Sequence, residues 1–334
     1  MNKLKEYGLT FFLVIILIIC LIYYYTRDEK VTKELKDVKL LPTIVTKLED
    51  NTIYCPTFQL VWNDLKKEAG GNVSFIDDEN NQMARELNLE TFTENDISSD
   101  YYYKNYGLMT PSLKKEISDG VWKKFKQQSS ILNEFNFQED SKDYLFYAML
   151  YKEFSFLEPF DIINNDTFGI TSKSNSKLDK NLEVLFYQDD SYAVFVKTKT
   201  GDEVILYKGN RMDSFLDTYK MIDLETKEAF QENDTLTIPN LDFKIKYEYK
   251  ELENKKMIFK DNNYTLDKAL QTIEFKLDNN GGKVKSEAGI SNKYTSVEPG
   301  RNFNFSDDFI LFVKESNQEL PYLALNIKDI DSFR

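Results

Sequence analysis

The sequence predicts an α+β protein with mixed and antiparallel sheets, a cluster of N-terminal helices and one transmembrane helix before them. Three observations lead to this prediction. An uninterrupted apolar run occupies residues 8–25. Helical periodicity characterises the segments between residues 58 and 132. From residue 144 onward, short apolar or alternating runs of strand length are separated by turn residues.

Residues 8–25 have the length and composition of a transmembrane helix. The run GLTFFLVIILIICLIYYY contains only Thr10 and its terminal tyrosines as polar interruptions. As a helix it spans about 27 Å, which is close to the hydrocarbon thickness of a bilayer. Lys3 and Lys5 precede it, and no small-residue cleavage site follows. We therefore expect a single-pass signal anchor in the cell membrane, with residues 1–7 cytoplasmic and the remainder extracytoplasmic. A buried core helix is the alternative.

Composition excludes several classes of function. The net charge of −13 argues against nucleic-acid and anionic-lipid partners, because both require a basic surface. The chain has no histidine, which excludes Ser-His-Asp and Cys-His catalysis and the common zinc motifs. Cys20 and Cys55 are the two cysteines, and Cys20 lies in the apolar run. The adjacent acidic pairs suit solvated turns better than catalysis. We expect no catalytic residues, no metal and no cofactor, and therefore no enzyme.

The first helices follow a region of mixed charge. Residues 26–51 are interpreted as a stalk or a short surface helix, and residues 52–334 as the extracytoplasmic domain. Phe58, Trp62 and Leu65 follow helical spacing, and a Gly-Gly pair at residue 70 ends that helix. A short strand is predicted over residues 73–76.

A second helix begins at Thr110-Pro111, where a capping hydroxyl precedes a proline in the first turn. Ile117, Val121, Phe125 and Leu132 form its predicted buried face. The remaining predicted elements are strands over residues 144–151, 182–187, 192–198, 203–207, 238–245, 273–277, 309–313 and 322–327, and a helix over residues 213–230. The last two strands are expected to pair with each other.

Six segments resemble, in the same order, segments of the serpins, a family of serine protease inhibitors. They are PTFQLVWNDLKKEAGGNVSFI (56–76), QMARELNL (82–89), YLFYAMLYK with the later PFD (144–152 and 159–161), IPNLDFKI (238–245), DNNGG (278–282) and FNFSDDF (303–309). The resemblance covers nearly all of residues 52–334. Within it the early helices are shortened, Tyr147 replaces an asparagine of the family, and Phe156 stands for its tryptophan.

The resemblance implies a monomer with an exposed reactive loop at about residues 281–303. A target protease would attack this loop and form an acyl-enzyme. It would be trapped when the cut loop inserts as a strand of the main sheet. The implied hinge residues are Gly281, Gly282, Val284, Ser286 and Ala288. The implied scissile region comprises Lys293, Tyr294, Thr295 and Ser296.

The loop sequence itself has a strand-like alternation. If it is extended, Gly282, Val284, Ser286, Ala288 and Ile290 share one face, and all are small or apolar. Their neighbours Lys283, Lys285, Glu287, Gly289 and Ser291 share the other face, which suits water. The segment is therefore able to become a half-buried strand. A polar loop with chance alternation is the alternative.

Two hypotheses of function remain. The first is a membrane-anchored inhibitor of a serine-type peptidase, whose partner is the target protease. The second is a non-inhibitory surface protein that keeps the fold as a binding scaffold. Asn279-Asn280 in place of acidic residues, Gly282 in place of threonine, and Lys285 and Glu287 in place of alanines favour the second.

Overall fold

The structure is a computed structural model of the 334-residue chain that describes residues 33–35, 37–171, 179–188, 190–281 and 300–333. Contacts divide the chain into the units Met1–Lys33 and Glu34–Arg334. The predicted transmembrane helix, residues 8–25, lies outside the described residues. Within the described ranges no helix has both the length and the apolar character needed to cross a membrane.

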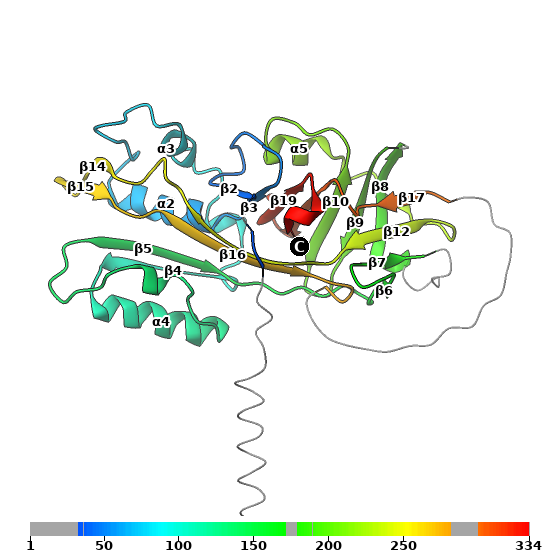
Figure 1. Ribbon diagram of the computed structural model, residues 1–334, viewed down its shortest axis with the longest axis horizontal. Coiled ribbons are helices and arrows are strands. Elements are labelled where there is room, and N and C mark those ends of the chain that lie inside the picture. Colours follow the sequence, from blue (N-terminus) through cyan, green and yellow to red (C-terminus); the bar gives the residue numbers. More distant parts are fainter. Residues whose placement is uncertain (1–32, 36, 172–178, 189, 282–299, 334) are drawn as a thin grey trace, which may run out of the picture. The chain divides into compact units, whose positions relative to one another are not determined.

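The larger unit is organised on an eight-stranded sheet of order β11-β8-β9-β10-β18-β19-β3-β2 (Figure 1). Its two C-terminal strands occupy the centre, between strands from the middle and the beginning of the unit, and all their side chains are buried. The strands are β2 (Lys39–Leu41), β3 (Thr52–Tyr54), β8 (Leu182–Gln188), β9 (Ser191–Lys197), β10 (Asp202–Lys208), β11 (Glu228–Ala229), β18 (Phe309–Glu315) and β19 (Leu323–Ile327).

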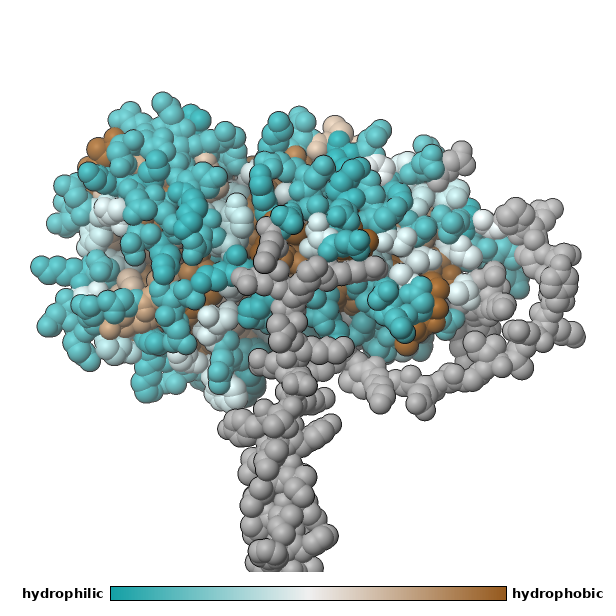
Figure 2. Space-filling model, viewed as in Figure 1, coloured by the Kyte–Doolittle hydropathy of each residue, from teal (hydrophilic) through white to brown (hydrophobic). Residues whose placement is uncertain are grey.

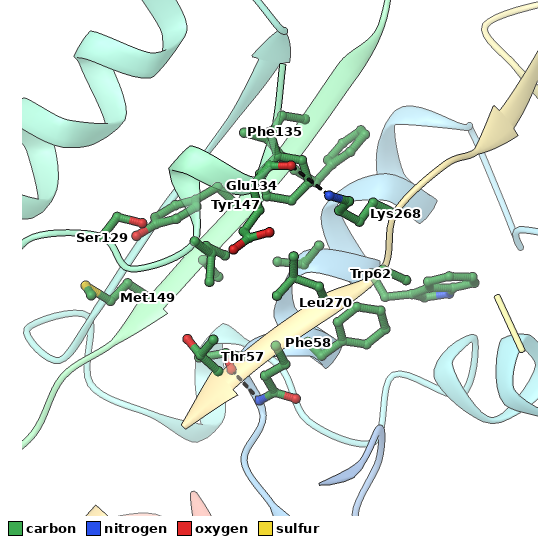
Figure 3. Close-up of a pocket in the computed structure, with 18 of the residues that line it drawn as sticks. Thr57, Phe58, Trp62, Ser129, Glu134, Phe135, Tyr147, Met149, Lys268 and Leu270 are labelled. Atoms are coloured by element: carbon green, nitrogen blue, oxygen red, sulfur yellow. Dashed lines mark hydrogen bonds between the residues drawn. The ribbon is translucent and has the colours of Figure 1, made fainter. Parts of the chain in front are cut away.

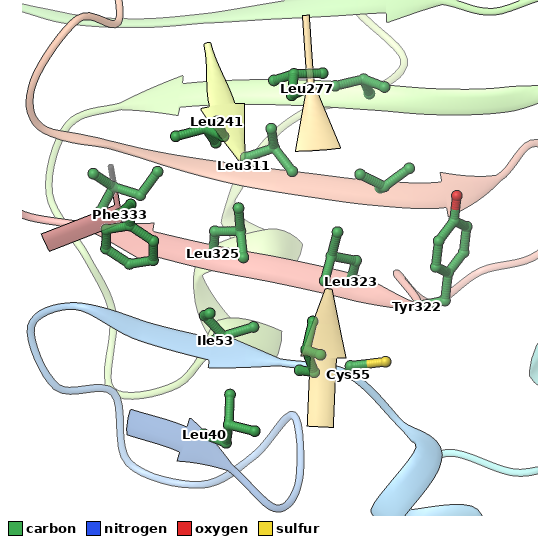
Figure 4. Close-up of a cluster of buried hydrophobic side chains, with 14 of the residues drawn as sticks. Leu40, Ile53, Cys55, Leu241, Leu277, Leu311, Tyr322, Leu323, Leu325 and Phe333 are labelled. Carbon is green, nitrogen blue, oxygen red and sulfur yellow. The ribbon is translucent and has the colours of Figure 1, made fainter. Parts of the chain in front are cut away.

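One row of side chains across this sheet shows how the core is built. Directly paired positions on neighbouring strands carry aliphatic residues on the same face, and part of the row is visible in Figure 4. The row comprises Val184, Val194, Leu206, Leu311, Leu325, Ile53 and Leu40. All seven belong to the largest apolar cluster of the unit. The aliphatic pattern therefore favours this register from β8 across to β2.

The other strands form smaller sheets. A four-stranded sheet has the order β17-β12-β7-β6, a three-stranded sheet has the order β1-β13-β16, and β4 with β5 and β14 with β15 form two-stranded ladders. These strands are β1 (Lys33–Glu34), β4 (Tyr102–Leu108), β5 (Tyr144–Leu150), β6 (Asp161–Ile162), β7 (Thr167–Ile170), β12 (Thr235–Pro239), β13 (Leu241–Glu248), β14 (Lys255–Phe259), β15 (Asn262–Leu266), β16 (Leu270–Leu277) and β17 (Asn302–Asn304).

The helices cover the sheets. They are α2 (Thr57–Glu68), α3 (Gln82–Leu87), α4 (Pro111–Phe125) and α5 (Phe215–Met221), with 3₁₀ turns at Glu94–Asp96, Leu132–Glu134, Asp179–Asn181 and Ile330–Phe333. Thr110 caps α4 by accepting a hydrogen bond from the Leu113 amide, and Lys126 ends it in a left-handed conformation. Leu113, Ile117 and Val121 of α4 pack against β5 (Figure 1). The visible face of the molecule is largely hydrophilic (Figure 2).

Most predicted strands and the helices at residues 58 and 111 are confirmed, as is the pairing of the last two long strands. The helix predicted over residues 213–230 is too long. It ends at Met221 because the Asp223 carboxylate accepts hydrogen bonds from the Glu225 and Thr226 amides and closes a turn.

Two other predictions need correction. The strand predicted over residues 73–76 is absent. The Asn88 side chain binds both backbone groups of Val73, and a turn follows at Phe75. The boundary of the folded unit also differs from the predicted one at residue 52. Residues of the predicted stalk, Leu35 and Leu40 among them, are buried in the core.

Candidate functional site

A cavity of about 1250 Å³ lies between β5 and β16. Every residue of β5 lines it, as do Leu270–Phe275 of β16. Among the described residues β5 pairs with β4 alone and β16 with β13 alone, so each strand has one unpaired edge. Unpaired strand edges carry free backbone donors and acceptors, which another strand satisfies. We call this cavity the slot.

The two strands run in the same direction along the slot. At its beginning, Tyr144 of β5 lies 6.1 Å from Tyr264 of β15, ring centre to ring centre, and β15 directly precedes β16. At its end, Ser155 forms a β-bridge with Gly281, a few residues beyond β16. A single strand entering the slot from the Gly281 end would therefore run antiparallel to both neighbours.

Helix α2 forms the inner floor of the slot. Phe58, Val61, Trp62 and Leu65 line it, and Figure 3 shows Phe58 and Trp62 beside Leu270 of β16. Trp62 is buried, and its indole N–H donates to Asn88 Oδ1 at 3.0 Å. The floor is therefore apolar and rigid. It suits the small or apolar face of a half-buried strand.

A polar network lies at the β16 side of this floor. Gln271 Nε2 donates to the Cys55 carbonyl and to Thr57 Oγ1, and Gln271 Oε1 accepts from the Tyr249 hydroxyl at 2.6 Å. Burial raises the pKa of the Cys55 thiol to about 11. The thiol is therefore protonated at neutral pH and inert as a nucleophile.

Residues 127–138 lie over the opposite, outer side of the slot, and we call this segment the strap. Leu145 and Tyr147 of β5 pack with Leu132 of the strap and with α4, whereas Phe146 packs with the α2 side. Adjacent residues of a strand face opposite sides, so the strap and α2 enclose the slot between them. Figure 3 shows Ser129, Glu134 and Phe135 of the strap together with Tyr147.

Polar contacts tie the strap to the strands beyond the slot. Lys246 on β13 forms an ion pair of 2.8 Å with the Glu134 carboxylate, and the Lys268 ammonium donates to the Glu134 carbonyl. The Ser130 and Thr272 hydroxyls are 3.2 Å apart. These contacts bridge the slot from the β5 side to the β16 side. Any strand that enters must displace or pass beneath the strap.

We expect Glu134→Gln to loosen the strap with little effect on global stability, because exposed ion pairs are screened by water and contribute little to folding. The hydrogen bond from Lys246 lowers the pKa of the Glu134 carboxyl below its ordinary value of 4.5. The contact is therefore intact above pH 4.5 and is lost as the pH falls through the lowered value. At pH 7, amide hydrogen exchange in residues 129–136 should be faster in the variant than in the wild type. At acidic pH, the exchange rate of these residues in the wild type should approach that of the variant. Equal exchange at pH 7 would contradict this role.

Gly281, the first residue of the predicted hinge, lies at the entrance of the slot. Gly281 is buried with φ of +103°, and an added Cβ would lie 2.6 Å from the Phe154 carbonyl oxygen. The Phe156 amide donates to the Asn280 carbonyl, and the Phe160 amide to the Asn279 carbonyl. The start of the loop is therefore fixed to the segment that follows β5.

We expect Gly281→Val to destabilise the protein by about 1–3 kcal/mol, because the residue combines a strained backbone with a steric overlap. Gly71→Val is the matched control, since its Cβ meets nothing within 4 Å. Thermal unfolding of both variants checks the prediction. Equal midpoints would mean that Gly281 is not constrained.

A buried ionic cluster lies beside the entrance. The Lys152 ammonium pairs with Asp202 Oδ1 at 2.8 Å and with the Glu315 carboxylate. The three side chains are 3%, 0% and 5% exposed. The same ammonium lies 3.8 Å from the centre of the Tyr101 ring, and the Tyr322 hydroxyl donates to Asp202. This cluster joins the end of β5 to β10 and β18 of the eight-stranded sheet.

Arg301 lies at the start of the next described segment, which begins at residue 300. The Arg301 guanidinium binds the buried Asp234 carboxylate at 2.7 Å, pairs with Glu228 at 2.8 Å and lies over the Phe303 ring. The following strand β17 pairs in parallel with β12. The described residues on either side of residues 282–299 are therefore anchored, Gly281 by its bridge to Ser155 and Arg301 by this ion-pair cluster.

Of the predicted site residues, only Gly281 falls within the described part of the chain. Gly282, Val284, Ser286 and Ala288 of the hinge lie outside it. The scissile candidates Lys293, Tyr294, Thr295 and Ser296 also lie outside it. Within the described residues, no cluster of three or more Cys, Asp or Glu side chains has a geometry able to hold a metal ion.

Comparison with known proteins gives a likeness at the level of solved structures. No protein-family model and no curated protein matches the chain. Solved serpins are similar to it. Human thyroxine-binding globulin complexed with thyroxine matches at 12% identity over 65% of this chain and 64% of that one, with a TM-score of 0.40. A highly specific serpin of the insect Tenebrio molitor, Serpin48, matches at 12% identity over 77% and 72%, with a TM-score of 0.40.

Tengpin, a thermophilic serpin in its native state, matches at 11% identity over 66% of this chain and 64% of its own, with a TM-score of 0.42. The chain thus spans less than two thirds of the length of thyroxine-binding globulin and of Tengpin.

Sequence reasoning missed the slot, the strap and the ionic cluster. Gln271, Glu134, Asp202 and Glu315 look like ordinary surface positions in the sequence. A signal was present only for Lys152, which directly follows the apolar run of β5.

Proposed function

We propose that this chain is a membrane-anchored serpin-like protein that inhibits a serine-type peptidase by inserting its own cut loop as a strand. The observation that carries the proposal is the slot, which has two unpaired parallel edges, an apolar floor and the loop hinge at its entrance. The small or apolar face of residues 282–290 matches that floor. On this proposal the protein is a stoichiometric inhibitor and not an enzyme.

The slot and the serpin resemblance together support the following steps. A protease attacks the loop after residue 290, and an acyl-enzyme forms on the newly made C-terminus. Residues 282–290 then enter the slot from Gly281 and carry the bound protease toward the β14-β15 end. Pairing with both edges releases free energy that the uncut loop cannot gain while its far end is held at Arg301. Residues 8–25 would display the domain at the cell surface.

A non-inhibitory binding scaffold is the second candidate. Lys285 and Glu287 must leave water beneath or beside the strap, which slows insertion, and slow insertion lets the acyl-enzyme hydrolyse. The contacts of Glu134 and Ser130 that hold the strap in place also favour the scaffold, because they oppose entry of a strand. In this case the loop is a substrate and is cut without trapping.

Incubation with a panel of serine proteases decides between the two. An inhibitor gives a covalent complex that survives SDS and contains the protease and residues 1–293 or slightly more. A scaffold gives clean cleavage or none, with the protease recovered active. A protease with its catalytic serine replaced is the control, because it binds the loop without forming the acyl-enzyme. Cleavage without any covalent complex by all proteases that cut the loop would exclude inhibition.

A further inference from the structure

The ionic cluster beside the slot entrance brings one amine and two carboxyl groups into direct contact in the interior. Lys152 Nζ lies 2.8 Å from Asp202 Oδ1 and also contacts the Glu315 carboxylate, and the three side chains are 3%, 0% and 5% exposed. Asp202 and Glu315 are directly paired residues of β10 and β18, so both carboxylates face the same ammonium. The proposed inhibition makes no use of these three groups.

Charges are an unfavourable way to fill this position. Two carboxylates share one ammonium, so the cluster carries a net negative charge when all three groups are ionised. Buried ions lose their hydration, and the attraction between them offsets only part of that loss. Condensing the ammonium with one carboxylate would replace two buried ions by a neutral amide, which needs only ordinary hydrogen bonds. Burial therefore favours the amide, whereas water favours the separate ions.

We propose that Lys152 and Asp202 form an intramolecular isopeptide bond, an amide between the two side chains, with Glu315 as the proton carrier. The Lys152 amine attacks Asp202 Cγ, a C–N bond forms and one Cγ–O bond breaks. Two protons move from Nζ to the leaving oxygen, which departs as water. Glu315 relays these protons and ends ionised, as it began. The reaction consumes no oxidant or other co-reactant, and it does not depend on protease inhibition.

Hydrogen bonds to both oxygens mark Asp202 as the carboxyl group that is attacked. The Tyr322 hydroxyl donates to Oδ1 at 3.1 Å, and the Thr200 hydroxyl donates to Oδ2 at 2.7 Å. These donors stabilise the negative charge that develops on the oxygens when the amine adds to Cγ. Burial, together with the charge of Asp202, raises the pKa of Tyr322 well above its ordinary value. The tyrosine hydroxyl therefore keeps the proton that it donates.

Glu315 is placed to carry protons. Its Oε2 accepts a hydrogen bond from the Ser98 amide at 2.8 Å, and its Oε1 accepts from the Lys152 ammonium. A base fixed in contact with the amine can remove a proton as the C–N bond forms. The ring centres of Tyr101 and Tyr322 lie 3.8 and 5.0 Å from Nζ and shield it from water. The fixed contact between amine and carboxyl replaces the chemical activation that amide formation otherwise requires.

The bond would join the end of β5 to the start of β10. Lys152 follows β5, which borders the slot, and Asp202 is the first residue of β10 in the eight-stranded sheet. Acid or denaturant separates an ion pair, whereas an amide persists in both. A chain with this bond therefore remains closed across residues 152–202 after unfolding.

Mass spectrometry of the denatured full-length chain tests the proposal. We expect an intact mass one water molecule below that of the sequence, and a tryptic peptide pair joined through Lys152 and Asp202. Trypsin should not cleave after Lys152, because an acylated lysine has no charge. Lys314 and Glu203 are the internal control, since they form a 2.7 Å ion pair between the same two strands. Within the described residues no second carboxylate contacts Lys314, so this pair should stay unlinked.

Two variants, followed from cell-free synthesis onward, test the roles. Lys152→Arg keeps a cation in the cluster but should give the full mass and no linked peptide. Glu315→Gln should slow linking on the order of a hundredfold, because it removes the proton carrier. The mass of the wild-type chain decides the existence of the bond whether or not these variants fold.

A wild-type chain of full mass that trypsin cleaves after Lys152 would overturn the proposal and leave an ordinary ion cluster. Equal linking of Lys314 with Glu203 would also overturn it, because it would mean unselective condensation during handling. An unchanged rate in Glu315→Gln, or an amide to Glu315 in place of Asp202, would overturn the assigned roles. None of these results bears on whether the loop is inserted, which the covalent complex with a protease reports.

Discussion

A single cut between residues 291 and 299 is expected to raise the thermal unfolding midpoint by about 10 °C. Insertion buries Val284 and Ile290, each worth roughly 1.5–3 kcal/mol, and fills two strand edges at once. In a domain of this size about 1 kcal/mol corresponds to a few degrees. The new ladder bonds offset part of the cost of ordering the segment. Calorimetry of the uncut and cut chains measures the shift.

A proline variant separates insertion from other effects of cutting. Ser286→Pro removes a ladder donor from the middle of the inserting segment, so it should abolish the rise. Ser291→Pro lies beyond the inserting segment, residues 282–290, and should leave the rise intact. An unchanged midpoint in the cut wild type would favour the scaffold. A rise that survives Ser286→Pro would mean that stability comes from elsewhere.

Lys152→Met should destabilise the protein by about 3–5 kcal/mol, because it leaves two buried carboxylates without their cation. Asp202 and Glu315 are almost inaccessible to solvent, and the ammonium between them also contacts two tyrosine rings. Denaturant unfolding measures the loss. Lys250→Met removes a lysine with two ion pairs that is 69% exposed, so it should leave the denaturation midpoint almost unchanged.

Neutralising the whole cluster provides a sharper test. Lys152→Met combined with Asp202→Asn and Glu315→Gln should recover part of the loss, because removing a complete buried ion cluster costs less than removing one partner. A triple variant less stable than Lys152→Met would refute this electrostatic account. Packing around the Lys152 stem would then be the stronger term.

Local patterns were enough to predict many elements. The aliphatic runs of β9, β10 and β18 are buried on both faces, so their hydrophobicity alone marks them. The cap at Thr110 fixed the start of α4. In contrast, β14 and β15 were not predicted, although Met257 and Phe259 of β14 are buried and alternate with exposed residues. In strands of five residues this alternation is too short to stand out from the surrounding polar sequence.

The site was predictable only in part. The alternation of residues 282–290 indicated a segment able to become a strand, and Gly281 stood out in the DNNGG turn. The place that such a strand would occupy depends on the gap between β5 and β16, whose sequences are far apart. Tyr147 and Leu270 border one cavity although more than a hundred residues separate them. Contacts of that kind arise from topology and leave no local pattern.

The placement of β17, β18 and β19 decides what becomes of the molecule after a cut. All three strands follow the loop, and β18 and β19 lie at the centre of the eight-stranded sheet. The short C-terminal piece would therefore stay in place, held by core packing and by Arg301. Refolding of the cut protein becomes the association of two separate polypeptides, so its recovery after heating would depend on concentration. A molecule that has acted once would be stable, yet unable to rebuild itself efficiently when diluted and unfolded.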